Sequence, residues 1–196
     1  MSAALTLLAS VKARLKIDPA DTNDDALLTS FIEYASGLFC KYCHRTFERG
    51  VNVQEEFWCE DRELRPSRYP IEAVASFETM SDQATGWVLE SDVQYQLWTT
   101  KNGIYLVSRL GSGMEKLRLT YTGGYVLPGN TPGAGQTALP NEIEHACTEQ
   151  VAYWFSSKDR LGVSSASTEG SSVSYSNLKL VASVQMTLDR YRRFLM

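Results

Sequence analysis

The sequence lacks any long hydrophobic run. No segment approaches the roughly 18 uninterrupted apolar residues that a membrane-spanning helix needs, so no membrane contact is expected. The N-terminal segment MSAALTLLASVKARLKI also lacks the arrangement of a signal peptide, because Lys12, Arg14 and Lys16 lie within its apolar run and not ahead of it. We therefore expect a soluble protein made in a reducing cytoplasm, in which the four cysteines stay as thiols.

Histidine is scarce, and the common catalytic motifs are missing. Only His44 and His145 are present, which leaves little material for a Ser-His-Asp triad, and no Gly-x-Ser-x-Gly elbow occurs. The Gly-Ser-Gly stretch at 111–113 lacks the remaining residues of a phosphate-binding loop. Glu142 and His145 have the E-x-x-H spacing of a di-iron helix, but no second copy of that motif exists. These residues provide no basis for predicting an enzyme or a cofactor.

Neither sign of charge dominates the chain. With 19 basic and 23 acidic residues the formal net charge is −4 at pH 7, which argues against nucleic-acid binding over the whole surface. Hydrophobic residues make up 43% and charged residues 21%, as in ordinary globular proteins. A chain of 196 residues can bury a real core within one domain.

Helical periodicity marks both ends of the chain. Apolar residues recur at helical spacing around 7–15 and 25–42, and the acidic loop DPADTNDD joins these segments. In that loop Thr22 followed by Asp25 fits a capping box that would begin the second helix. Two further amphipathic segments follow Pro140 and occupy VQMTLDRYRRFLM. The Ser-rich segment between them, 160–177, is expected to be a mobile connection.

The hydrophobic period changes in the middle of the chain. Five short segments rich in β-branched and aromatic residues predict a small antiparallel sheet, at 51–58, 71–80, 95–100, 103–108 and 116–122. Pro and Gly in 126–138 predict a flexible loop without regular structure. The expected fold class is α+β. A helical body of about four helices, 1–50 and 139–196, carries an antiparallel β-rich insertion, 51–125, between the second and third long helices.

Cys40, Cys43 and His44 form C-x-x-C-H, the spacing that attaches c-type haem. Haem attachment normally follows export and needs a second axial ligand, for which only His145 or a Met is available. A zinc site would need these residues to meet others in space, namely Cys59, Cys147 or His145. A haem or zinc protein stays a remote alternative, and ordinary packing of the cysteines is the expected role.

Several short motifs follow one another along the chain. They read V-K-x-x-L-x-I-D, Y-x-x-R-T-F, P-[IV]-x-x-V, Y-T-G-G-Y, L-P-x-x-I-x-x-A-x-x-x-x-V-A-x-W-[FY] and L-x-x-Y-R-R, at 11–18, 42–47, 70–74, 121–125, 139–155 and 188–193. In this order they resemble the tailed-bacteriophage head-tail connector (adaptor) proteins over nearly the whole chain. The C-x-x-C-H residues are not part of that family's pattern, so the resemblance implies that their spacing is a coincidence.

The resemblance implies a structural protein and not an enzyme. As in that family, 1–196 would form a single connector domain, and identical subunits would form a ring, twelve-fold as a rule, beneath the portal protein of the filled capsid. The ring would extend the DNA channel, through which DNA passes without specific binding, and would join the capsid to the next neck component or the tail. The implied location is the head-tail neck of the virion. A neck or tail-completion protein that attaches on the tail side is the alternative.

The C-terminal segment combines arginine with aromatic side chains, the residue types favoured as interface anchors. Its residues are Tyr191, Arg192, Arg193 and Phe194. Together with the resemblance, this composition predicts that the four residues dock on the portal protein. The alternative is that the segment folds back on its own subunit.

Overall fold

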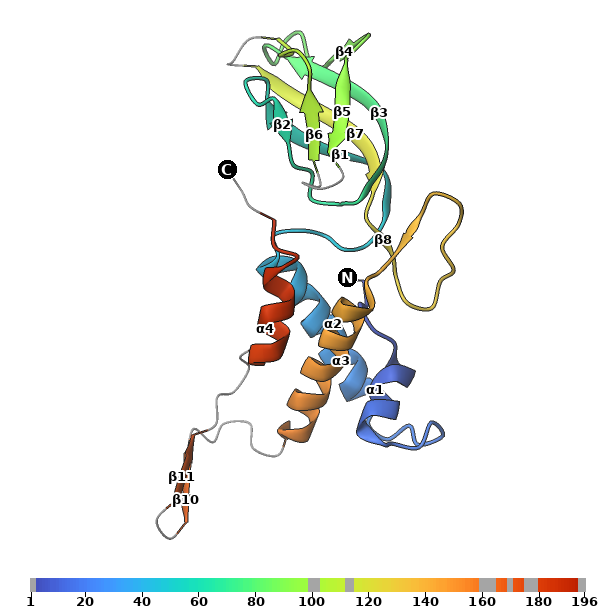
Figure 1. Ribbon diagram of the computed structural model, residues 1–196, viewed down its shortest axis with the longest axis vertical. Helices are drawn as coiled ribbons and strands as arrows, with labels where there is room; N and C mark the ends of the chain where they lie inside the picture. Colours follow the sequence, from blue (N-terminus) through green and yellow to red (C-terminus); the bar gives the residue numbers. More distant parts are fainter. Residues whose placement is uncertain are drawn as a thin grey trace. The chain divides into compact units, whose positions relative to one another are not determined.

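The computed structural model describes residues 3–98, 103–111, 115–158, 165–168, 171–174 and 180–193. The chain is 31% helical and 28% strand, which confirms the α+β class. In chain order, strands β1 to β7 follow α2 and precede α3, as predicted for the insertion (Figure 1). The chain divides into two compact units. The helical unit is Met1–Cys43 with Leu139–Arg192, and the β unit is His44–Ala138, to which Arg193 also belongs.

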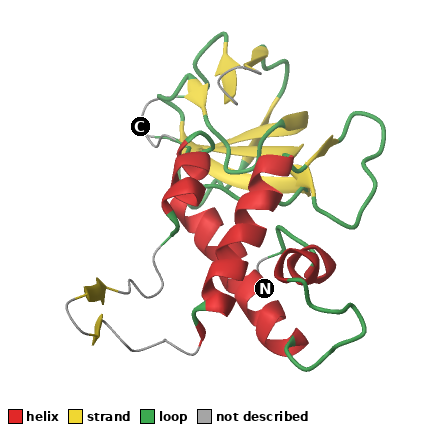
Figure 2. Cartoon of the chain, turned by 60° about the horizontal axis from the view of Figure 1, so that its bottom comes forward, coloured by secondary structure: helices red, strands yellow, loops and turns green. Residues whose placement is uncertain are grey.

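Helix α3 is central to the helical unit. This unit contains α1 (Leu8–Leu15), α2 (Asp25–Tyr42), α3 (Asn141–Ser156) and α4 (Ala182–Asp189). Helix α3 contacts each of the other three, and Figures 1 and 2 show α1 and α4 on opposite sides of the α2–α3 pair. The apolar stripes supply the core, with the fully buried side chains Val11, Leu28, Ala35, Phe39, Ile143, Cys147, Val151, Val184 and Leu188. None of the four described helices combines the length and apolar character that a membrane span requires.

A buried lysine joins α1 to the acidic loop. The side chain of Lys12 is 6% exposed, and its ammonium lies 2.6 Å from a carboxylate oxygen of Asp25. The ammonium also donates to the backbone carbonyls of Asp21 (2.7 Å) and Pro19 (3.3 Å). The predicted capping box of Thr22 and Asp25 is wrong, because no side chain caps the first turn of α2. The Asp25 carboxylate instead offsets the desolvation of the Lys12 ammonium.

The β unit contains two antiparallel sheets where the sequence predicted one. The larger has the order β1 (Gly50–Trp58), β7 (Lys116–Gly123), β3 (Ile71–Met80), β4 (Val88–Glu90). The smaller has the order β2 (Glu63–Leu64), β6 (Gly103–Leu106), β5 (Tyr95–Trp98). Side chains from both sheets share one core, formed by Cys59, Leu64, Phe77, Ile104, Leu106, Leu110, Leu117, Leu119 and Tyr121. The five predicted strand segments correspond to β1, β3, β5, β6 and β7.

Two segments for which the sequence predicted no regular structure contain short strands. In the loop after the sheet, β8 (Tyr125–Val126) pairs in parallel with β9 (Thr137–Ala138). In the Ser-rich segment, β10 (Ser165–Thr168) pairs antiparallel with β11 (Ser171–Ser174). The sequence did not predict these strands, because segments of two to four residues are too short for a hydrophobic period and their pairing follows the path of the chain.

A hydrogen-bonded carboxylate fixes the segment before β3 to the larger sheet. Glu55 on β1 accepts hydrogen bonds from the Ser67 backbone N–H (2.9 Å), from the Ser67 hydroxyl and from the Tyr121 hydroxyl on β7. The Arg68 N–H donates to the same Tyr121 oxygen (3.1 Å). Burial, and then the neighbouring Glu55, raises the pKa of Tyr121 well above its ordinary value. Tyr121 therefore stays a neutral donor within the core.

Arg45 is a buried cation at the start of the β unit. It is 3% exposed, and its guanidinium carbon lies 3.3 Å from the ring centroid of Tyr69, 4.6 Å from that of Phe47 and 5.2 Å from that of Tyr125. One guanidinium nitrogen donates to the Tyr69 carbonyl, while Nε and Nη1 have no hydrogen-bond partner among the described residues. The faces of the three rings therefore provide most of the stabilisation of this charge.

Two adjacent glycines allow backbone segments to meet at the end of β7. A Cβ atom at Gly123 would lie 2.8 Å from the carbonyl oxygens of Arg68 and Pro70. A Cβ atom at Gly124, where φ is +102°, would lie 2.6 Å from the Glu48 carbonyl oxygen. Both contacts are closer than real Cβ atoms approach, so only glycine fits. The Y-T-G-G-Y motif thus marks a backbone crossing.

We expect Lys12→Met to lower the free energy of unfolding by about 2 kcal/mol, because methionine keeps the aliphatic stem but leaves Asp25 without its partner. The cost is below that of a fully buried pair because the Asp25 side chain is 28% exposed. Urea denaturation measures the change. The control Arg14→Met, at an exposed position of the same helix, should change the free energy by less than about 0.5 kcal/mol. Equal losses in both variants would refute a structural role for the Lys12 ion pair.

We expect Gly124→Ala to lower the free energy of unfolding by more than about 2 kcal/mol, since both a positive φ and a backbone clash oppose the new Cβ. Gly135→Ala is the matched control: φ is +77°, but a Cβ there has no neighbour within 4 Å. It should cost about 1 kcal/mol. Thermal and urea denaturation measure both variants. A Gly124→Ala variant as stable as Gly135→Ala would show that the crossing relaxes.

Candidate functional site

The structure does not bring Cys40, Cys43 and His44 together as ligands. Cys43 is buried and its thiol donates to the Leu188 carbonyl oxygen (3.5 Å), Cys40 is half-buried, and His44 is exposed. Across the described ranges, no group of three or more His, Cys, Asp or Glu residues is placed to hold a metal ion. Cys43 packs the end of α2 against α4.

The two remaining cysteines are packing residues in separate units. Cys147 on α3 is fully buried beside Ser36, with 3.9 Å between its sulfur and the serine oxygen, and burial raises the pKa of Cys147 to about 12. Burial likewise raises the pKa of Cys59 in the β unit to about 11. Both thiols are therefore protonated at neutral pH, which makes them poor nucleophiles and poor metal ligands.

The predicted docking residues follow α4. Figure 1 shows that α2 and α4 end, and α3 begins, at the same end of the helical unit. Tyr191 is half-buried, and its hydroxyl donates to the Glu142 carboxylate on α3 (3.3 Å). Arg192 is exposed and Arg193 is half-buried. Phe194 lies outside the described residues.

A tyrosine and an aspartate that the sequence analysis did not select complete this surface. The Tyr42 hydroxyl donates to the Asp189 carboxylate (2.6 Å), and the Arg192 guanidinium carbon lies 5.8 Å from the Tyr42 ring centroid. This hydrogen bond is the main reason why the pKa of Tyr42 is raised above its ordinary value. We call Tyr42, Asp189, Tyr191 and Arg192 the docking face. It presents an aromatic ring and an exposed guanidinium, which suit a protein partner with carboxylate or aromatic groups.

The sequence carried only a partial signal for the docking face. Tyr42 and Asp189 are 147 residues apart, so no local pattern could pair them. Tyr42 does begin the Y-x-x-R-T-F motif, and Asp189 lies within L-x-x-Y-R-R. The sequence places each residue in a motif, but it does not predict the hydrogen bond between Tyr42 and Asp189.

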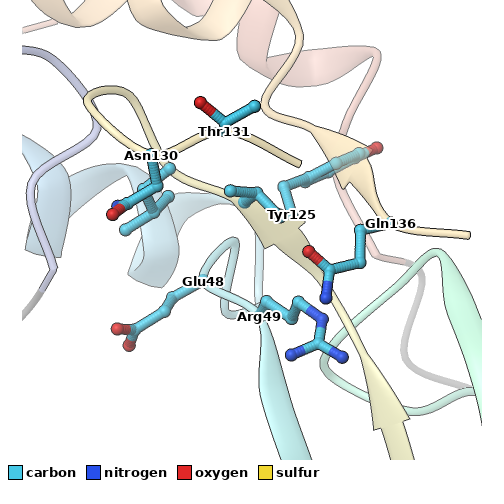
Figure 3. A pocket seen from close by; sticks show the side chains of 8 residues that line it. Glu48, Arg49, Tyr125, Asn130, Thr131 and Gln136 are labelled. Atoms are coloured by element: carbon cyan, nitrogen blue, oxygen red, sulfur yellow. The ribbon is translucent and has the colours of Figure 1, made fainter. Parts of the chain in front are cut away.

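A shallow pocket of about 280 Å³ lies in the β unit. Figure 3 shows Tyr125 near its centre, with Asn130 on one side and Gln136 on the other. The remaining lining residues are Glu48, Arg49, Val126, Leu127 and Thr131. Arg49 is already engaged, because its guanidinium forms a two-point ion pair with Glu72 at 2.8 to 3.1 Å. Among the described residues, no histidine, cysteine or serine lines the pocket.

Comparison with known proteins identifies the class of fold. Neither a protein-family model nor a curated protein matches the chain. Among the solved structures with a similar chain are two necks of GTA (gene transfer agent) particles, which share the fold. In the neck of an empty GTA particle computed with C6 symmetry, the similar chain has a TM-score of 0.58 and 15% identity, over 98% of this chain and 91% of that chain. In the neck of a native GTA particle computed with C12 symmetry, the values are 0.52 and 13%, over 100% and 97%.

We expect Asp189→Asn to lower the pKa of the Tyr42 hydroxyl toward about 10, the ordinary value for tyrosine, because the carboxylate that holds its proton is removed. A raised folded-state pKa means that this bond stabilises the fold fully below about pH 10 and loses that effect as the pH rises through the folded pKa. Carbon-13 NMR of the tyrosine rings during alkaline titration follows the change. Glu33→Gln, which alters an exposed carboxylate on α2, should leave the titration of Tyr42 unchanged. An unchanged pKa in Asp189→Asn would contradict the hydrogen bond.

Proposed function

We propose that the chain is a structural component of the head-tail neck of a tailed-bacteriophage-like particle. The observation that carries the proposal is the fold, which chains from two GTA particle necks share over 98% and 100% of this chain. The motifs of the connector family support it, because Lys12, Arg45 and Gly124 belong to those motifs and hold the fold through specific contacts. The role is non-enzymatic, and the protein acts within the virion.

In this proposal identical subunits form a ring that extends the channel for DNA. The connector family forms twelve-fold rings as a rule, and one of the neck structures with this fold was computed with C12 symmetry. The formal charge of −4 per subunit suits a channel through which DNA slides. A basic lining would instead retain the phosphates by releasing their counterions.

The partner on the capsid side is the portal protein, and the docking face with Arg193 and Phe194 is the proposed contact. Support comes from the exposed Arg192 beside the Tyr42 ring, since arginine and tyrosine are enriched among residues that dominate binding energy. The contact between Tyr191 and Glu142 shows that part of the segment also packs on its own subunit. Tyr191 can therefore pack on its own subunit while the exposed Arg192 binds the partner.

The alternative function is a neck or tail-completion protein that attaches on the tail side. Both functions use a ring, and they differ in the partner that the docking face binds. Purified portal and tail proteins of the same virus, immobilised separately, distinguish them by which one retains the chain.

We expect Arg192→Ala to weaken binding to the portal protein at least tenfold, because the exposed guanidinium is lost while the fold is kept. Arg190→Ala, an equally exposed arginine two residues earlier, should bind as the unaltered chain does. Surface plasmon resonance measures both affinities, and circular dichroism checks the fold. A truncation that removes the chain from Leu188 onward would not test docking alone, because it also removes a fully buried side chain from the core. Equal binding by both variants would contradict docking through Arg192.

A further inference from the structure

One side of α2 presents a row of apolar side chains that are exposed or half-buried in the described part of the chain. Leu27, Phe31, Tyr34 and Leu38 recur at spacings of four, three and four residues, so they form one row along the helix. We call this row the α2 strip. Leu27 is 36% exposed and Tyr34 51% exposed, while Phe31 and Leu38 are half-buried. An exposed apolar row on a helix is typical of a contact surface.

The α2 strip rests on a rigid support. The ring of Phe31 lies edge-on to the buried Trp154 of α3, with 6.1 Å between centroids, and the ring of Tyr34 lies 5.3 Å from the same indole. These contacts hold both aromatic side chains in place before any partner arrives. A surface ordered in this way loses little conformational entropy on binding.

Helix α1 lies on the other side of α2. Lys12 of α1 pairs with Asp25, and the Leu5 backbone N–H donates to the Ser36 hydroxyl (3.0 Å). At 100° per residue, Asp25 and Ser36 lie on roughly the opposite side of α2 from the strip. Exposed Ala9 and Ala13 lie on α1, and the 41% exposed Leu7 directly precedes the helix as its N-cap. We call these three residues the α1 flank.

We propose that the α2 strip of one copy of this chain packs against the α1 flank of a second copy. This inference rests on the proposed ring. A ring closes through heterologous contacts, in which one surface of a subunit meets a different surface of its neighbour. The α2 strip and the α1 flank are two such surfaces, on opposite sides of the pair formed by α1 and α2. The small side chains of Ala9 and Ala13 leave room for the rings of Phe31 and Tyr34.

The size of the α2 strip favours a ring over an isolated pair. Its four residues cover roughly 17 Å of one helix. Four side chains are few beside the about 20 to 30 residues that each partner of a stable protein pair contributes. In a closed ring every subunit makes the contact twice, once with each surface. Releasing one subunit therefore requires breaking two contacts, so a ring is more stable than a single pair.

Disulfide cross-linking tests the contact in solution. In a Cys40→Ser background, which removes the half-buried thiol, we expect Ala13→Cys with Tyr34→Cys to give a ladder of covalent oligomers on oxidation, at least tenfold above either single variant. Ala13→Cys with Glu33→Cys is the matched control, because exposed Glu33 points away from the strip on the same helix. It should give no ladder. Native mass spectrometry of each sample reports ring formation independently.

Each outcome decides the proposal. A ladder from the Ala13/Tyr34 pair alone supports it. Dimers from Tyr34→Cys alone would mean that two strips face each other, which overturns it. A ring that forms without the ladder overturns the proposed contact and leaves the neck function standing. A chain that stays monomeric and uncross-linked at the highest soluble concentration overturns the contact, and binding to the portal protein then decides the neck function separately.

Discussion

The β unit depends on one buried cation. Arg45 brings together three segments that are far apart in the sequence: the segment after α2, which contains Phe47, the segment before β3, which contains Tyr69, and the segment after β7, which contains Tyr125. Because Nε and Nη1 find no hydrogen-bond partner in the described part of the chain, the aromatic rings around the charge are what stabilise it. The backbone crossing at Gly123 and Gly124 lies in the same part of the chain and brings the ends of these segments into contact.

Local sequence patterns predicted the longer helices and strands. Helical spacing predicted α2 and α3 closely, and β-branched and aromatic content predicted β1, β3 and β7. The short strands β2, β4, β8 and β9 were missed because two or three residues carry no periodicity, and their pairing is decided by the path of the chain. The capping box at Thr22 failed for a related reason: the carboxylate of Asp25 has a better partner in Lys12. The assignment of 1–196 to a single connector domain stays a prediction.

The sequence selected two of the four residues of the docking face, and their docking role stays a prediction. Arginine and aromatic content indicated Tyr191 and Arg192, whereas Tyr42 and Asp189 became visible only through their hydrogen bond. The motifs that resemble the connector family contain Lys12, Arg45 and Gly124, each of which makes a structural contact and not a catalytic one. The chains of the two GTA particle necks share the fold with this chain at 15% and 13% identity.

These observations support a protein that acts through its shape and its surfaces. The most direct measurement is native mass spectrometry of the purified chain, alone and mixed with the portal protein of the same virus. The proposed neck function predicts a closed ring of identical subunits, formed by the chain itself or on the portal. A chain that remains monomeric in both samples, and binds no portal, would contradict it.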